Sequence, residues 1–191
     1  MWSNEEIKEY LKSSLNENRY NHCIGVSKTS KKLAKLYGAN EEKAELAGLT
    51  HDCAKYMESE KILQILKDNG EEIDVVVQHW PPLMHGYAGE YVAREVFGIE
   101  DEEVLSAIKY HVTGRENMTL LEKIVFIADF IEPGRDFPGV EKARTLAYED
   151  LDEAIIFAFD STISFVMKSG NLLHTKTIDS RNYLLLNRKN K

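Results

Sequence analysis

An all-α fold, a bundle of helices, is predicted for this chain by two observations. Apolar residues recur at intervals of three and four along nearly the whole sequence, which is the period of an amphipathic helix. Alternating runs rich in β-branched residues, the pattern of strands, are nearly absent, and only VVVQHW at 75–80 is ambiguous. The chain is therefore expected to form a succession of helices.

Capping residues indicate where the first two helices begin and end. Ser3 or Asn4 can cap a first helix, because short polar side chains satisfy the free N–H groups at a helix start. A second helix is expected over about 19–37, since Gly38 suits the left-handed residue that commonly follows a helix.

The next segment brings a third helix with chemically important residues. It follows Asn40, has acidic residues in its first turn to suit the helix dipole, and is expected to carry His51 and Asp52 near its end. A short helix over 59–67 ends at the turn signal Asp-Asn-Gly. Residues 68–84 are then expected to form a long ordered loop.

Three further helices are expected in the middle of the chain. One covers about 85–97, and Asp101 can cap another that leads to His111. Thr119 and Glu122 form a capping box for the helix that ends in IVFIADFIEPG. After EPGRDFPG two more are expected, one over the apolar residues between 151 and 166 and one from about Thr177 to the basic tail NRKNK.

Composition and charge exclude several classes of protein. A net charge of −8 and a pI near 5.3 oppose an electrostatic grip on long nucleic acids. The N-terminus is polar and acidic, and no run of eighteen apolar residues occurs, so neither export nor a membrane span is expected. Two cysteines without CxxC spacing do not indicate a disulfide scaffold, and a cytoplasmic location is expected.

A set of histidines and aspartates on predicted helices indicates a metal site. His51 and Asp52 are adjacent, His22 precedes them, and Asp129 follows in an otherwise apolar helix. Imidazole nitrogens and carboxylate oxygens suit divalent transition metals, and a buried carboxylate needs a partner. Each residue alone has an ordinary alternative: His22 as a core histidine, Asp129 paired with Lys123. If all four residues had only such ordinary roles, their joint occurrence in this pattern would require four coincidences.

The order H…HD…D on consecutive helices resembles the HD superfamily of metal-dependent phosphohydrolases. The segments RYNHCIGV, AGLTHDCAKY, LMHGYAG, AIKYHVTG, IVFIADFIEPGRDFPGV and GNLLHTKTIDSRN together resemble more closely the YqeK family of bacterial HD-domain hydrolases, which split diadenosine tetraphosphate symmetrically. The likeness runs from about residue 19 to 182. It implies a single HD-type domain over 1–191, with a core of about 19–135 and C-terminal helices that complete the nucleotide site.

The resemblance implies one divalent metal ion bound by His22, His51, Asp52 and Asp129. Iron is favoured, and manganese, cobalt or zinc suit the same ligands. Water activated by the metal would attack a β-phosphorus and release ADP on each side, with no covalent enzyme intermediate.

The matched motifs also imply residues that contact the small-molecule nucleotide substrate. The catalytic set would be Asp52, His85, His111 and Lys55, with the imidazoles and Lys55 supplying positive charge. The binding set would be the metal ligands His22, Asp52 and Asp129, together with His85, His111, Val112, Arg135 and the distal residues Gly170, Asn171, Leu172, Leu173, His174 and Thr175. Val112 is a departure, because the family usually reads His-Thr-Thr-Gly there. From residues alone, Lys55 favours a solvated side chain, and Arg135 can instead pair with Asp136 or Glu132.

Other functions are left open by the sequence. Another HD hydrolase would act on a nucleoside monophosphate, a guanosine alarmone or a cyclic nucleotide. A non-catalytic nucleotide or metal-binding regulator would keep the fold without turnover, and a structural adaptor would bind no metal. A homodimer is compatible with the sequence, which does not decide the oligomeric state.

Overall fold

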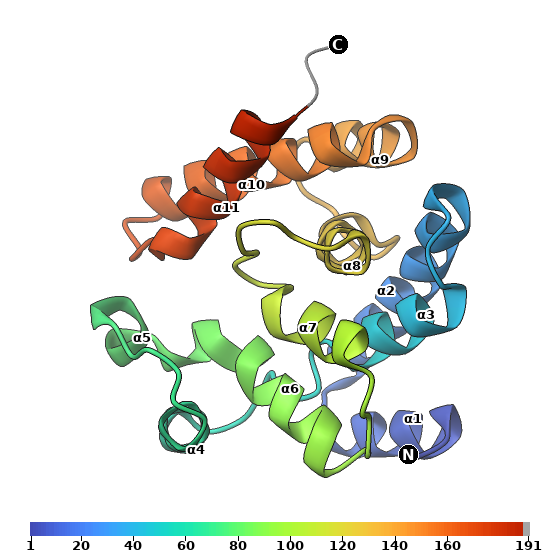
Figure 1. Ribbon diagram of the computed structural model, residues 1–191, viewed down its shortest axis with the longest axis vertical. Helices are drawn as coiled ribbons and strands as arrows, with labels where there is room; N and C mark the ends of the chain where they lie inside the picture. Colours follow the sequence, from blue (N-terminus) through green and yellow to red (C-terminus); the bar gives the residue numbers. More distant parts are fainter. Residues whose placement is uncertain (189–191) are drawn as a thin grey trace.

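A computed structural model describes residues 1–188 of the chain, which within that range form eleven α-helices, one 3-10 helix and no β-strand (Figure 1). The all-α prediction is confirmed. The helices are α1 (Asn4–Ser14), α2 (Glu17–Tyr37), α3 (Glu41–Thr50), α4 (Ser59–Asp68), α5 (Val75–His79), η1 (Pro81–Met84), α6 (His85–Glu95), α7 (Glu102–Tyr110), α8 (Leu120–Ile131), α9 (Val140–Glu149), α10 (Leu151–Lys168) and α11 (Thr175–Asn187).

Helix α8 lies at the centre of the bundle, where Figure 1 views it almost end-on. It packs against α2, α3, α7, α9 and α10. Its run of apolar residues explains this position, because a helix that is apolar on nearly all sides must be surrounded by others. One contiguous core of buried side chains extends from Ile7 of α1 to Leu184 of α11.

The predicted caps are present in the structure. The Ser3 side chain accepts the amide hydrogen of Glu6, and Gly38 has a φ of +73° at the end of α2. The capping box of Thr119 and Glu122 starts α8. These contacts supply partners for backbone groups that helix ends leave free.

The end of α3 differs from the prediction. The helix stops at Thr50, so His51 is its C-cap and Asp52 lies in the turns that follow. Hydrogen bonds three residues apart, such as Lys55 N–H to the Asp52 carbonyl, tighten the chain there. Lys55 therefore lies on this turn segment.

Two short elements were absent from the prediction. The stretch expected as a loop over 68–84 contains α5 and η1, so the ambiguous VVVQHW is helical. Asp74 caps α5 by accepting the Val77 amide hydrogen. Three helices, not two, follow the EPGRDFPG turn, because α9 begins after Gly139 without a side-chain cap and so had no N-terminal signal.

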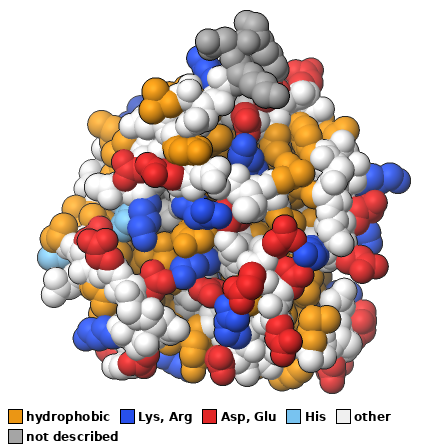
Figure 2. Space-filling model, viewed as in Figure 1, with side chains coloured by type: hydrophobic (Ala, Val, Ile, Leu, Met, Phe, Trp, Pro, Cys, Tyr) orange, Lys and Arg blue, Asp and Glu red, His pale blue; other side chains and the backbone are white. Residues whose placement is uncertain are grey.

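Smaller differences concern helix ends. Helix α6 ends at Glu95, two residues before the expected end, and α11 begins at Thr175 because the His174 imidazole caps it. The last residues of the basic tail, 189–191, lie outside the described part of the chain. None of the helices within residues 1–188 is long and apolar enough to cross a membrane. Figure 2 shows acidic and basic side chains interspersed over one face.

Candidate metal centre and active site

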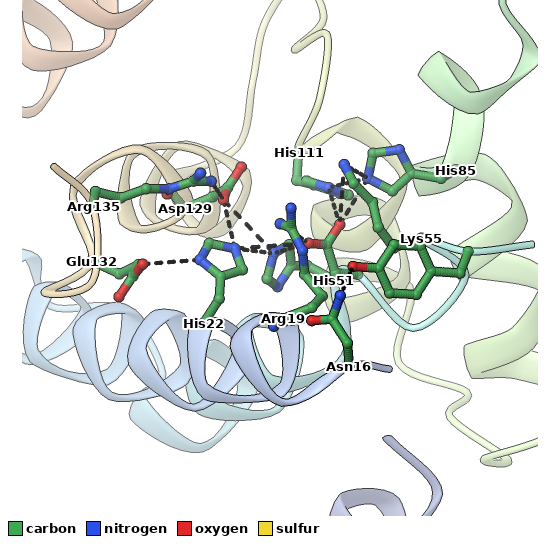
Figure 3. A network of polar contacts seen from close by, with 12 residues as sticks. Asn16, Arg19, His22, His51, Lys55, His85, His111, Asp129, Glu132 and Arg135 are labelled. Carbon is green, nitrogen blue, oxygen red and sulfur yellow. Dashed lines mark hydrogen bonds and ion pairs between the residues drawn. The ribbon is translucent and has the colours of Figure 1, made fainter. Parts of the chain in front are cut away.

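The four predicted metal ligands meet in one cluster (Figure 3). His22 projects from α2, His51 and Asp52 follow α3, and Asp129 projects from α8. His22 Nε2 lies 3.0 Å from Asp129 Oδ1 and 3.3 Å from His51 Nε2. Asp52 Oδ2 lies 3.4 Å from His51 Nε2. The packing of α2, α3 and α8 against one another holds these atoms together.

Backbone carbonyls fix the orientation of three imidazoles. In His51, His85 and His111 the Nδ1 atom lies 2.7 to 2.8 Å from the carbonyl oxygen three residues earlier, which belongs to Gly48, Pro82 and Ile108 respectively. A carbonyl only accepts hydrogen bonds, so Nδ1 must carry the proton. In its neutral form each ring would then present the Nε2 lone pair to the cluster, as in metal-binding histidines.

Asp52 is the central anion of the site. It is 1% exposed, and its Oδ1 lies 2.8 Å from His85 Nε2 and 3.6 Å from His111 Nε2. Oδ1 nevertheless has no hydrogen bond of good geometry, although Oδ2 accepts one from Arg19 at 2.7 Å. A buried carboxylate oxygen without a donor is costly.

The donor set fits a divalent metal ion. Nε2 lone pairs converge at 3.3 Å between His22 and His51 and at 3.1 Å between His85 and His111. Neutral imidazoles in this tautomer repel one another at such distances unless a cation or a proton lies between them. Two overlapping groups have ligand geometry, namely His22–His51–Asp129 and His51–Asp52–His111.

Burial and charge shift the pKa values of the cluster in a consistent direction. Burial lowers the pKa of His85 to about 4 and also lowers that of His111, although Asp52 opposes both shifts. Burial alone would raise the pKa of Asp52, but the nearby imidazoles outweigh it and hold that pKa well below its usual value. At neutral pH His85 and His111 are therefore neutral and Asp52 is ionised, and in these protonation states such side chains can bind metals.

Close backbone packing sets the positions of His85 and His111. Gly86 of α6 faces α7, and a Cβ atom there would lie 2.6 Å from the Lys109 carbonyl oxygen and 3.2 Å from His111 Nδ1. Only glycine permits this approach. The contact brings His85 at the start of α6 next to His111 at the end of α7.

Two residues of the site were missed by the sequence prediction. Glu132 is 4% exposed, and its Oε1 lies 3.0 Å from His22 Nδ1. Arg19 bonds Asp52 directly. Both residues fall inside motifs quoted above, RYNH and ADFIEPGR. The sequence does not distinguish a charged residue near a helix end that is buried against a partner from one that is solvated.

The other predicted site residues lie close to the cluster or border it. Lys55 Nζ lies 3.3 Å from His85 Nε2 and 3.8 Å from Asp52 Oδ1. The Arg135 guanidinium donates to both the carbonyl and the carboxylate of Asp129, and only its backbone N–H donates to the Glu132 carbonyl oxygen. Lys123 pairs with Asp152, so Asp129 does not depend on it.

The distal segment 170–175 has a different setting. Gly170, Asn171 and Leu172 are exposed, Leu173 is half-buried and Thr175 starts α11. His174 is buried, with Nε2 at 3.3 Å from Asp74. Farther along α11, Ser180 Oγ lies 3.3 Å from the carbonyl oxygen of Thr113, beside the half-buried Val112. The segment thus contacts Asp74, the N-cap of α5, and its contact with a nucleotide stays a prediction.

Comparison with known proteins agrees with the fold. A family model for the HD domain matches residues 19–134, and the chain belongs to this family of HD-domain proteins. It is 46% identical over 181 residues to "Bis(5'-nucleosyl)-tetraphosphatase, symmetrical" of Halalkalibacterium halodurans, with 95% of this chain and 96% of that protein covered. It is 40% identical in sequence to the Bacillus subtilis protein of the same name, with 95% of this chain and 97% of that protein covered.

A solved structure has the same fold. The crystal structure of a predicted HD superfamily hydrolase involved in NAD metabolism from Clostridium acetobutylicum matches with a TM-score of 0.95 and 49% identity, covering 98% of this chain and all of that one. Family membership, expected from the H…HD…D pattern, is confirmed.

Proposed function

We propose that this protein hydrolyses diadenosine tetraphosphate symmetrically to two molecules of ADP. The observation that carries the proposal is the complete donor set around Asp52, in a chain 40–46% identical over nearly its whole length to proteins named for this activity. A regulator that had lost catalysis would have no need to keep every ligand. We also propose that 1–191 acts as one catalytic unit, which the single core cluster supports.

His22, His51, Asp52 and Asp129 would hold the metal ion. Iron is our first choice, with manganese, cobalt or zinc as alternatives, because imidazole and carboxylate donors suit all four. When bound, the cation supplies Lewis-acid activation of water and neutralises charge on the attacked phosphate.

The residues around the cluster would stabilise the phosphate chain. Lys55, Arg19 and Arg135 place positive charge beside Asp52 and Asp129. An ADP leaving group departs as an oxyanion, so fixed cations at this point lower the barrier. His85 and His111 were expected to add charge, but burial keeps them neutral. They are better suited to hold a cation.

Product analysis tests the proposal. Protein purified without oxygen is incubated with diadenosine tetraphosphate and ferrous, manganous or zinc ion, and the products are separated by chromatography. We expect ADP alone, and no turnover by Asp52→Ala. AMP plus ATP would mean asymmetric cleavage, and an intact substrate alongside cleavage of a cyclic nucleotide or an alarmone would assign the protein to another HD activity. Binding without any turnover would favour a regulator.

Location and assembly are part of the same proposal. We propose a cytoplasmic enzyme that acts on a small nucleotide, and a homodimer is compatible with this function. Size-exclusion chromatography with light scattering measures the oligomeric state directly.

A further inference from the structure

A cleft runs along α2 past the metal cluster. Its volume is about 730 Å³, within the roughly 300–1,000 Å³ of small-molecule sites. In Figure 3, Arg135 lies at the left and Asn16 below and to the right of it, with His22 and Arg19 between them. All four line the cleft, and Lys28 and Tyr56 line it too. The cleft therefore opens directly onto a predicted metal ligand, His22.

The charge of the cleft favours a polyphosphate. Its lining contains three cations, Arg19, Lys28 and Arg135, and one carboxylate, Glu132. That carboxylate is already engaged, because Oε1 faces His22 Nδ1 and Oε2 accepts the Gly134 amide hydrogen at 2.6 Å. Arg19 and Arg135 are also paired, with Asp52 and Asp129, which do not line the cleft. The lining itself carries more cations than carboxylates, in contrast to the net charge of −8 for the chain. Guanidinium groups suit phosphate oxygens in particular.

One end of the cleft has groups that suit a nucleoside. The Tyr56 ring is half exposed, and its hydroxyl accepts a hydrogen bond of 2.6 Å from Asn16 Nδ2. Aromatic faces stack on nucleobases without preference for sequence. The exposed amides of Asn18 and Asn21 also line the cleft and can bond ribose hydroxyls.

The cleft is separate from the segment 170–175, which the sequence analysis expects to contact the nucleotide. Its lining comes from α2 and its N-cap, the turn after α3 and the loop after α8. The segment 170–175 is instead attached to α5 through Asp74. Symmetrical cleavage leaves equal halves of the substrate on the two sides of the broken bond, so the active site needs two nucleotide subsites.

We propose that the cleft along α2 binds one ADP half of the dinucleotide, with Arg19, Lys28 and Arg135 at the phosphates and Tyr56 against the base. This inference rests on the proposed function, because it assigns a place to the second half of that substrate. It makes a separate prediction, namely that each chain holds two molecules of ADP.

Equilibrium dialysis of the metal-loaded full chain with radiolabelled ADP tests the stoichiometry. We expect two ADP per wild-type chain and one per Lys28→Glu chain. Lys35→Glu is the matched control, because Lys35 is also exposed on α2 but lies outside the cleft. It should still bind two. Circular dichroism and thermal unfolding confirm that both variants fold.

Kinetics give a second readout. Loss of one base-stacking contact in Tyr56→Ala should raise KM for diadenosine tetraphosphate about fivefold or more. Binding of a single ADP by wild type, or two by Lys28→Glu with unchanged affinity, would overturn the inference. Its failure is distinguishable from failure of the proposed function. If the wild-type protein cleaves the substrate but binds one ADP, only the assignment of the cleft is refuted. If the wild-type protein shows no turnover, the proposed function itself is refuted.

Discussion

Glu132 Oε1 lies 3.0 Å from His22 Nδ1, so a buried carboxylate orients the imidazole whose Nε2 faces Asp129. This arrangement fixes the tautomer and the ring orientation of His22, as second partners of metal-bound histidines do. The backbone permits it because Gly25 leaves room, and a Cβ atom there would lie 2.5 Å from Glu132 Oε2.

Replacing this partner should weaken metal binding without removing a ligand. We expect Glu132→Gln to lower the affinity for Mn²⁺ about 10- to 100-fold, since loss of such a partner has effects of this size. Competition with a fluorescent chelator measures it. Glu141→Gln is the control, because Glu141 is an exposed glutamate on α9 that pairs with Arg144 one turn away. Equal affinities in both variants would show that Glu132 has no part in orienting His22.

Metal binding should also appear as thermal stabilisation. At about 100 times its Kd, a ligand specific to the folded state stabilises by about 2.7 kcal/mol, which in a chain of this size corresponds to a rise in Tm of about 5–10 °C. Asp129→Asn should lose most of this rise, because it neutralises a carboxylate that bonds His22 and Arg135. Differential scanning fluorimetry with and without Mn²⁺ makes the comparison. A full rise in the variant would exclude Asp129 as a ligand.

The stability of the metal-free protein should fall on acidification. Burial lowers the folded-state pKa of His85 from 6.5 to about 4, so between these values the unfolded chain binds more protons than the folded one. The free energy of unfolding therefore decreases as the pH falls from 6.5 to 4, by about 3 kcal/mol from this group. The pKa values of Asp52 and Asp129 are lowered well below their usual range, so these two groups affect the free energy of unfolding only at lower pH.

A histidine substitution isolates this contribution. Urea unfolding in EDTA at several pH values should give a flatter dependence for His85→Gln than for wild type. His79→Gln is the matched control, because His79 is exposed on α5. Its pH dependence should follow wild type, and a parallel curve for His85→Gln would contradict the burial argument.

The sequence predicted several helix starts and the four residues that meet in the cluster, because both have local signals. Helix α5 was missed although Asp74 caps it. Asp101 and Thr119 mark helix starts by side chains that bond the first turn. Helix α9 was missed because Gly139 provides no such bond. Glu132 and Arg19 were missed for another reason: their roles depend on burial and on partners 33 to 110 residues away, which only the packed structure reveals.

The close approach of α6 and α7 yields the last prediction. In Gly86→Ala the new Cβ would meet the Lys109 carbonyl oxygen at 2.6 Å, and backbone cannot yield as a flexible side chain does. The helices must separate, which we expect to cost about 1–3 kcal/mol of stability and to pull His85 away from His111.

Gly89→Ala is the matched control on the same helix, because its Cβ would first meet the Ile108 Cγ2 atom at 3.3 Å. Urea unfolding and turnover of diadenosine tetraphosphate are measured for both variants. In Gly86→Ala, but not in Gly89→Ala, we expect a loss of turnover larger than the loss of stability explains. The reason is that Gly86→Ala is still folded below its unfolding temperature, but its imidazoles are misplaced. Equal losses in the two variants would show that the spacing of α6 and α7 does not control the site.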